Sequence, residues 1–352
     1  MKIHLKKKPY IIAEIGINHN GYLSLAKKMI RASKNAGADA VKFQRRDVIE
    51  MINFSEKPKL ATGYLSKNEK DIKKIKKKFG TWVYPDIRLE LSESDYYELK
   101  KLCKKLKIDL IVTPWDYKSV EFVLRLNVKF IKIASIDANN YQFCEYIAKK
   151  NRPTIISTGM CTYDEILKTQ KIFKKFRTPH IFLHCTSAYP SNDKDKNLSC
   201  IPVLRKKLRD DVGFSGHGTD LIGAAGATML GANIIEKHVT LNKLMHGPDH
   251  AASLEFKEFS RMVEVCRRLV VAQGSSKKKF LGSEKTLHNI LIRKFIIAKN
   301  VKKNQKINDK NIKTILTYKK SGILPKEYYK ILKKKFKKNF NKGHILKFQD
   351  IK

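Results

Sequence analysis

The 352-residue sequence lacks the features that mark several classes of protein. Its six cysteines include no CxxC pair, so neither a zinc cage nor a disulfide framework is indicated, and we expect reduced thiols. No apolar run approaches the roughly 18 residues of a membrane-spanning helix. The first residues, Met1 to Pro9, have no long apolar core of a secretory signal. We therefore expect a cytoplasmic protein that has no contact with a membrane.

Acidic residues are also scarce: 33 Asp and Glu stand against 74 Lys and Arg, which gives a formal net charge of +41. Such an excess is typical of proteins that bind nucleic acid. Here lysine recurs along the whole chain and forms no single stripe interleaved with aromatic residues, which favours a solvated lysine-rich surface. We expect no nucleic-acid partner, and keep a basic nucleic-acid-binding protein on an inactive barrel as the alternative of another class.

Short apolar segments alternate with stretches of helical periodicity over the first 270 or so residues. The predicted strands are residues 10–15, 38–43, 109–113, 129–134, 154–157, 180–184, 212–215 and 233–237. Such alternation predicts a parallel sheet covered by helices, and eight units close most naturally into an α/β (β/α)8 TIM barrel. An open doubly wound sheet is disfavoured because no Gly-rich dinucleotide turn follows the first strand.

The chain changes character after the eighth unit. We predict a barrel domain at 1–273, a Gly/Ser/Lys-rich linker at 274–284, and a small β-rich domain at 285–352. In the small domain we expect a strand at 295–298, a turn at 300–307 leading into a second strand, and a helix at 326–332. The long lysine-rich connection between residues 45 and 90 is expected to lie over the active face of the barrel.

Polar residues stand at the carboxyl end of nearly every predicted strand, and in a barrel these ends share one mouth. The residues are Glu14, Lys42, Gln44, Thr113, Lys132, Ser135, Ser157, His184, Ser187, Ser215, His217, Lys237 and His238. A buried ammonium group is costly unless it meets an anion. Lys42 and Lys132, with several hydroxyls and the backbone of Gly216, would suit a phosphate and a carboxylate. The structural alternative is that the two lysines form salt bridges with Glu14 and Asp137.

His217 and His238 follow two consecutive predicted strands, so their imidazoles could meet at one point. Neutral imidazole is a common ligand of divalent transition metals. A metal site and a pair of packing histidines both remain open on this evidence. A metal with so few protein ligands would leave positions for a substrate oxygen, which suits Lewis-acid chemistry on a carbonyl. His246 and His250 are competing ligands, although their place in a loop favours a solvated role.

Several separated motifs, in order along the chain, resemble the N-acetylneuraminate (sialic acid) synthase family. They are Ile12-Ala-Glu-Ile-Gly-Ile-Asn-His-Asn-Gly21, Ala38-Asp-Ala-Val-Lys-Phe-Gln44, Ser157-Thr-Gly-Met160, His184-Cys-Thr-Ser-Ala-Tyr-Pro190, Gly213-Phe-Ser-Gly-His217, Glu236-Lys-His238 and Gly247-Pro-Asp-His-Ala-Ala-Ser-Leu254. The tail resembles the antifreeze-protein-like (SAF) domain of that family.

The resemblance implies a condensation of phosphoenolpyruvate with open-chain N-acetylmannosamine, giving N-acetylneuraminate and phosphate with C–O cleavage. It implies a divalent metal, Mn2+ first and Mg2+ or Co2+ as alternatives, held by His217 and His238. The phosphoenolpyruvate side is matched by Lys42, Thr113, Lys132, Ser135, Ser157, Ser215 and Gly216, and the sugar side by Gln44, Asp137, Ser187, Tyr189 and Asp249. The catalytic candidates are Glu14, which would orient water or the metal, and Lys42, His217, His238 and Asp249. A domain-swapped homodimer is implied, in which Arg293 reaches the partner's sugar.

The departures from the family pattern concern the sugar. Many bacterial members carry Ser-Asp-His where this chain has Ser215-Gly-His217, and Asn where it has Ser187. Lys294 and Phe295 replace the usual small polar residue after the arginine, which weakens the assignment of Arg293. The alternatives for the sugar are N-acetylmannosamine 6-phosphate and the di-amino-dideoxy hexoses that lead to legionaminate or pseudaminate.

Overall fold

The computed structural model describes residues 9–47, 51 and 89–352 of the chain. It divides into two compact units, residues 1–274 and 275–352. Most of the predicted long connection between residues 45 and 90 lies outside the described residues. Within the described part, none of the helices combines the length and the apolar character needed to cross a membrane.

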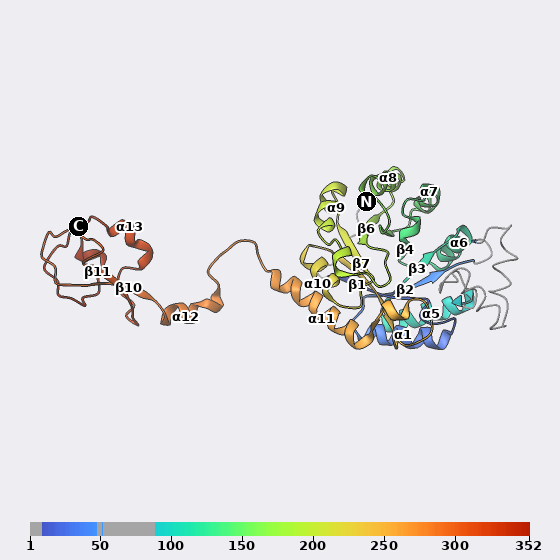
Figure 1. Ribbon diagram of the computed structural model, residues 1–352, viewed down its shortest axis with the longest axis horizontal. Coiled ribbons are helices and arrows are strands. Elements are labelled where there is room, and N and C mark those ends of the chain that lie inside the picture. The colour runs from blue at the N-terminus through green and yellow to red at the C-terminus, as the bar shows by residue number, and fades with distance from the viewer. Residues whose placement is uncertain (1–8, 48–50, 52–88) are drawn as a thin grey trace. The chain divides into compact units, whose positions relative to one another are not determined.

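The first unit is a closed parallel barrel (Figure 1). Its strands, among the described residues, are β1 (Tyr10–Gly16), β2 (Ala40–Arg45), β3 (Asp109–Pro114), β4 (Phe130–Ile133), β5 (Thr154–Ser157), β6 (His180–Cys185), β7 (Val212–Gly216) and β8 (Ile234–Thr240). Each strand pairs with the next, and β1 also pairs with β8, which closes the ring. The predicted TIM barrel is confirmed.

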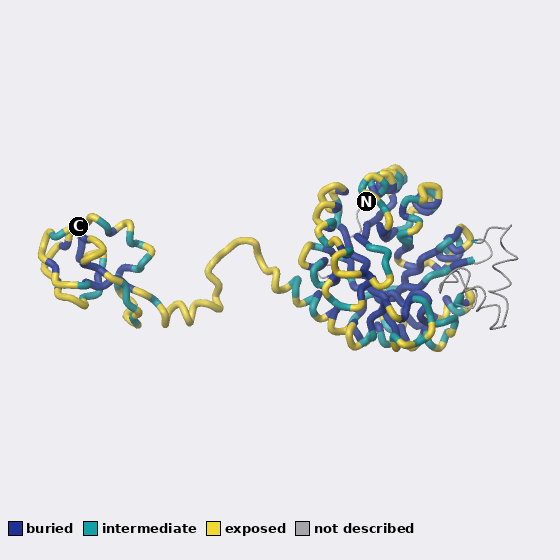
Figure 2. Tube along the Cα trace, in the orientation of Figure 1, coloured by how far each residue is buried: buried dark blue, intermediate teal, exposed yellow. Residues whose placement is uncertain are grey.

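Helices connect the strands and cover the outside of the ring, with their outer faces exposed (Figure 2). They are α1 (Leu23–Asn35), α5 (Glu93–Leu106), α6 (Tyr117–Leu126), α7 (Tyr141–Lys149), α8 (Tyr163–Lys175), α9 (Cys200–Leu208), α10 (Ile222–Met229) and α11 (Phe256–Gln273). Capping boxes at Ser92 and Thr162 satisfy the first amides of α5 and α8, so these helices begin where the sequence indicates. A short strand β9 (Leu254–Glu255) pairs with the end of β8.

The inside of the barrel is layered. Apolar side chains fill the lower part, among them Ile12, Ile111, Ile155 and Ile234. Side chains two residues apart on a strand point to the same face. The positions that follow this apolar layer toward the carboxyl ends therefore also point inward, and they carry the charged residues of the site.

The second unit has its own apolar core, which includes Phe295, Phe336 and Phe340. Strands β10 (Arg293–Ile297) and β11 (Ile312–Leu316) pair antiparallel, and α12 (Lys285–Ile290) and α13 (Tyr328–Ile331) are short helices. The turn predicted at 300–307 leads into a strand only at Ile312. Val301 and Lys306 instead form isolated bridges to residues 340 and 335, which extends the connection.

Candidate active site

A cluster of buried charges lies inside the barrel above the apolar layer. Lys42 Nζ is 2.8 Å from Glu14 Oε2 and donates to Thr113 Oγ1 at 3.2 Å. Lys132 Nζ donates to Ser157 Oγ at 2.6 Å. The structure therefore brings together these five residues, which the sequence predicted for the site, and each of them is almost fully buried.

Glu236 joins the two lysines and was not predicted as a site residue. Its Oε1 is 3.7 Å from Lys42 Nζ and 3.8 Å from Lys132 Nζ, and it accepts a hydrogen bond from Ser215 Oγ at 3.0 Å. We call Glu14, Lys42, Lys132 and Glu236 the charge cluster. The signal in the sequence was strand alternation: Ile234, Glu236 and His238 occupy every second position of β8 and share one face.

Of the two predicted salt bridges, one is confirmed and one is wrong. Lys42 pairs with Glu14, but the carboxylate near Lys132 is that of Glu236 rather than Asp137. Asp137 lies in the turn after β4, where its Oδ1 accepts from Asn140 Nδ2 at 3.1 Å, and burial raises its pKa. Lys237 is also misplaced by the prediction. It points away from the barrel interior and donates to the carbonyl oxygen of Gly218.

Burial and the opposite charges set the protonation of the cluster. Burial and nearby Glu236 raise the pKa of Glu14, although Lys42 opposes them. Burial disfavours the charged forms of Lys42 and Glu236, but their partners outweigh it, so the pKa of Lys42 is raised and that of Glu236 lowered. Burial lowers the pKa of Lys132 to about 8. At neutral pH both lysines are therefore charged and can bind an anion.

His217 and His238 lie side by side at the mouth of the barrel, with ring centroids 5.5 Å apart. The Nδ1 of His217 is 2.8 Å from the carbonyl oxygen of Thr186, so this nitrogen carries the proton and Nε2 keeps its lone pair. The Nδ1 of His238 is buried and has no hydrogen-bond partner among the described residues. Burial, and the charge that His217 carries when it is protonated, hold the pKa of His238 well below its usual range, which keeps this ring neutral.

These two rings fit a metal ion as two of its ligands, because His238 has a buried nitrogen without a hydrogen-bond partner among the described residues and the neighbouring His217 ring is already oriented through its Nδ1. Burial opposes a proton on His217, yet nearby Cys185 outweighs it and raises its pKa, so a metal would compete with a proton there. Among the residues that the structure describes, no group of three or more His, Cys, Asp or Glu side chains is arranged to hold a metal. Within the described residues, the two rings alone would leave coordination positions for water or substrate.

Asp249 approaches the same place from the loop after β8. Its Oδ2 is 3.9 Å from His238 Nδ1. Gly16 lies beside it, since a Cβ added there would be 3.5 Å from Asp249 Oδ2 and 3.2 Å from Glu14 Oε1. Gln44 Nε2 donates to Glu14 Oε1 at 3.0 Å. The structure thus places Asp249, Gln44 and Glu14 around one small region next to the histidines.

Three predicted residues lie on the rim. The Tyr189 ring packs against the His217 ring at an interplanar angle of 33°, with centroids 4.1 Å apart. Ser135 Oγ accepts from the backbone N–H of Gly159 at 3.0 Å, and a Cβ at Gly159 would be 2.2 Å from Ser187 Oγ. Glycine is required there because two serine side chains occupy the space of a larger residue. Ser135 and Ser187 therefore both lie against Gly159, just beyond the end of β5.

The remaining predicted residues are placed differently. Gly216 ends β7, where the Phe214 ring fills the space of a side chain, so packing alone requires a glycine. Arg293 begins β10 in the second unit and is exposed. His246 is exposed as expected, but the solvated role expected for His250 is wrong: His250 is fully buried.

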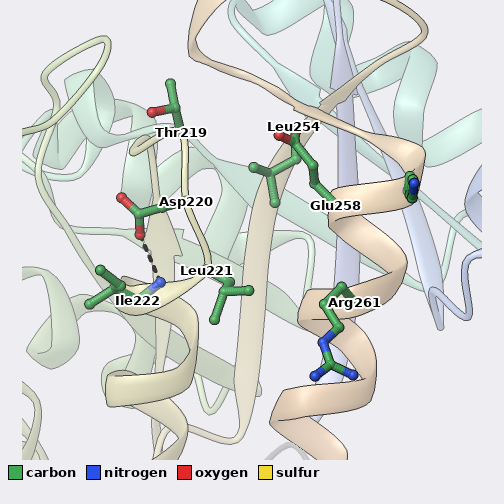
Figure 3. Close-up of a pocket in the computed structure, with 8 residues that line it drawn as sticks. Thr219, Asp220, Leu221, Ile222, Leu254, Glu258 and Arg261 are labelled. Carbon is green, nitrogen blue, oxygen red and sulfur yellow. Dashed lines mark hydrogen bonds between the residues drawn. The ribbon is translucent and has the colours of Figure 1, made fainter.

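A separate pocket of about 450 Å³ lies on the outer side of the barrel, between the start of α10 and α11 (Figure 3). Leu221, Leu254 and Arg261 are among the residues that line it, and Asp220 caps the backbone N–H of Ile222 beside it at 2.7 Å. None of the predicted site residues lines this pocket, so it is distinct from the mouth of the barrel.

A closed barrel with lysines, hydroxyls, carboxylates and imidazoles at one strand-end mouth defines a TIM-barrel enzyme whose site suits an anionic substrate. Comparison with known proteins agrees. Residues 29–278 match the NeuB family model. The chain is 32% identical over 348 residues to the N,N'-diacetyllegionaminic acid synthase of Legionella pneumophila, covering 97% of this chain and 94% of that protein.

Human N-acetylneuraminate-9-phosphate synthase is 36% identical over 328 residues, covering 93% of this chain and 88% of the human protein. The crystal structure of the N-acetylneuraminic acid (sialic acid) synthetase of Leptospira borgpetersenii, in complex with citrate, superposes with a TM-score of 0.67 and 31% identity, covering 82% of this chain and 95% of that one. The chain belongs to the NeuB family, and it is a synthase of the transferase class.

Proposed function

We propose that this enzyme condenses phosphoenolpyruvate with the open-chain aldehyde of an N-acyl hexosamine, with N-acetylmannosamine as the first candidate, to give a nonulosonate such as N-acetylneuraminate and phosphate. The observation that carries this proposal is the position of the charge cluster next to the histidine pair. The charge cluster suits a phosphate and a carboxylate, and the histidine pair with a metal ion suits an aldehyde oxygen. The names of the relatives support a condensing synthase.

In this proposal Lys42 and Lys132 hold the anionic groups of phosphoenolpyruvate, with hydroxyls of Thr113, Ser157 and Ser215 as further donors. C3 of phosphoenolpyruvate forms a bond to the aldehyde carbon, and the aldehyde oxygen takes up a proton. Water then adds at C2, and the C–O bond to phosphate breaks to leave a 2-keto acid. Glu14 is suited to accept the proton of that water, because its pKa is raised and it lies beside Lys42.

NeuB-family synthases are generally metal-dependent, and we propose that His217 and His238 hold a divalent ion here, Mn2+ first and Mg2+ or Co2+ as alternatives. When bound, the ion would polarise the aldehyde as a Lewis acid. Tyr189 and Asp249 would orient the sugar, since they flank the two rings. Gln44, Ser135, Asp137, Ser187 and Gly216 keep their predicted substrate-side roles in this proposal.

The test is phosphate release from phosphoenolpyruvate, measured with and without Mn2+ over a panel of sugars. We expect release only when a suitable hexosamine and the metal are both present. Release without sugar, or release that chelation does not reduce, would contradict the proposal. The panel includes N-acetylmannosamine 6-phosphate and the di-amino-dideoxy precursors of legionaminate and pseudaminate, so it also separates the alternative sugars.

We propose in addition that the second unit is an SAF domain, following a linker at 274–284, and that it caps the barrel of a partner subunit through Arg293. The support is that Arg293 is exposed at the start of β10, and that the segment before it leaves Phe280, Leu287 and Leu291 exposed. Mixing His217→Ala and Arg293→Ala chains tests the swap. Only a swapped dimer gives one intact site per mixed dimer, so activity should reappear on mixing and not in either variant alone.

The different-class alternative, a basic nucleic-acid-binding protein, would require affinity that falls steeply with salt together with no turnover. The paired lysines and carboxylates inside the barrel argue against it, because a silent barrel has no use for buried charges that are costly to bury. The cytoplasm stays the expected compartment of the enzyme.

A further inference from the structure

The loop after β8 contains a buried histidine, His250, that the proposed chemistry does not use. We propose that His250 is a positioning residue, which clasps this loop to the loop after β1 and so sets the place of Asp249 beside His238. The inference rests on the proposed function for the role of Asp249, and on the geometry of the two loops for the clasp itself.

Both ring nitrogens of His250 are occupied. Nδ1 is 2.7 Å from Thr240 Oγ1 at the end of β8, and Nε2 is 3.3 Å from Asn20 Oδ1 in the loop after β1. Asn20 Nδ2 donates to the carbonyl oxygen of His246 at 2.9 Å, which turns its Oδ1 toward the ring. Nε2 therefore carries the proton and donates to Asn20, while Nδ1 accepts from the Thr240 hydroxyl, which lies 2.7 Å from Nδ1 and 3.1 Å from the carbonyl oxygen of Asn242.

The ring is neutral at physiological pH, because burial and nearby His246 lower its pKa to about 4. A neutral ring with one donor and one acceptor matches these two partners and needs no counter-charge. His250 and Thr240 are both fully buried, so water does not compete for the bond between them, whereas Asn20 at the other end of the ring is half-buried.

A second set of bonds runs in parallel with the first. Asn18 Nδ2 donates to the carbonyl oxygen of Val239 and to Ser253 Oγ, both at 2.9 Å, and Ser253 Oγ donates to the carbonyl oxygen of Asp249 at 2.6 Å. Asp249 directly precedes His250 in the chain, and its own carbonyl oxygen is hydrogen-bonded to Ser253. Two short loops, far apart in the sequence, therefore fix the backbone that carries the Asp249 carboxylate.

Gly247 shows how closely the parts fit. Its φ is +151°, and a Cβ there would lie 2.6 Å from the His250 ring and 3.0 Å from Asn20 Oδ1. Any side chain would push the ring away from Asn20. The Gly247-Pro-Asp-His250 motif therefore encodes a backbone path that lets the ring close the clasp.

The test compares His250→Ala with His250→Gln, His250→Asn and, as a matched control on the same loop, His246→Ala. We expect His250→Ala to lower kcat by about 10- to 100-fold, because a misplacement of about 1 Å is enough for such a loss. The KM for phosphoenolpyruvate should stay near that of the wild type, since the charge cluster is carried by strands. A glutamine amide can reach Asn20 as Nε2 does, so His250→Gln should recover most of kcat, whereas the shorter His250→Asn should not.

Three kinetic results would overturn the positioning role: a normal kcat in His250→Ala, a loss expressed only as a higher KM for phosphoenolpyruvate, or equal loss in the alanine and glutamine variants. Amide hydrogen exchange needs no substrate and separates this proposal from the proposed function. His250→Ala should expose the amides of residues 18–21 and 246–253 together, and His246→Ala should not. Unchanged exchange in both segments would refute the clasp, whereas absence of turnover in the wild type would refute only the proposed function.

Discussion

The two halves of the candidate site are built in different ways. In the charge cluster, each ammonium group has a carboxylate within 4 Å and a hydroxyl partner, and all four residues are carried by strands. In the histidine pair, His217 lies just beyond β7, and His238 leaves a buried nitrogen without a hydrogen-bond partner among the described residues. The charges of the first half are paired within the protein, although Glu236 Oε2 has no hydrogen-bond partner among the described residues, whereas the second half is arranged for a group that is supplied from outside.

This difference predicts different kinds of failure. Substitutions in the charge cluster should affect both stability and the binding of phosphoenolpyruvate, because its charges stabilise each other when no substrate is present. Substitutions in the histidine pair should affect activity far more than stability, because within the described residues they remove little more than the hydrogen bond from His217 to the Thr186 carbonyl and the packing of two rings.

The largest effect is expected at the histidines. His217→Ala and His238→Ala should each abolish metal-dependent turnover, a loss of at least about 1,000-fold if the ion supplies several kcal/mol of charge stabilisation. Mn2+ binding, followed by calorimetry, should weaken in parallel, and thermal unfolding should change little. His246→Ala, an exposed histidine nearby, is the control that should keep activity. Normal turnover in the double variant would show that the pair is not a metal site.

The second effect is on stability. Glu236→Gln leaves two buried ammonium groups with only one carboxylate, and we expect it to destabilise the fold by about 3 kcal/mol in urea unfolding. Phosphoenolpyruvate should restore part of this loss, because its negative charges replace the missing one. The ligand should therefore raise the melting temperature of Glu236→Gln more than that of the wild type. Glu264→Gln, which breaks only exposed pairs on α11, should have no measurable effect. Equal melting temperatures of Glu236→Gln and wild type would contradict this reading.

The sequence predicted the eight barrel strands because each is a short apolar run with its own helix, and such local patterns survive folding. It also identified the lysines, since a lysine inside an apolar strand is anomalous wherever it lies. From the sequence, Glu236 was missed and Lys237 misplaced because residues were selected by their distance from the strand end. The alternation of side chains along β8 instead decides which of the two faces inward.

Other parts of the site could not be predicted from local sequence. His250 lies in a loop and was expected in water, but its burial depends on Asn20 and Thr240, which are 230 and 10 residues away in the chain. The sequence suggested only Asp137 as a partner of Lys132, because the contact with Glu236 depends on how the strands are arranged around the ring. Such long-range pairings are set by the closed barrel, which brings β8 beside β1.

The smallest predicted effect is a pH dependence of KM that distinguishes the roles of two buried lysines. Burial lowers the pKa of both Lys132 and Lys237 to about 8, but only Lys132 belongs to the charge cluster. Above pH 8 free Lys132 loses its proton, and binding of an anion must then restore it. The KM for phosphoenolpyruvate should therefore rise above about pH 8, by at most tenfold per pH unit. Lys132→Met should raise KM at neutral pH and flatten this rise, whereas Lys237→Met should keep it, because its ammonium group faces the backbone of Gly218. A wild-type KM that is constant from neutral to alkaline pH would mean that Lys132 does not bind the substrate anion, and would leave Lys42 to hold it alone.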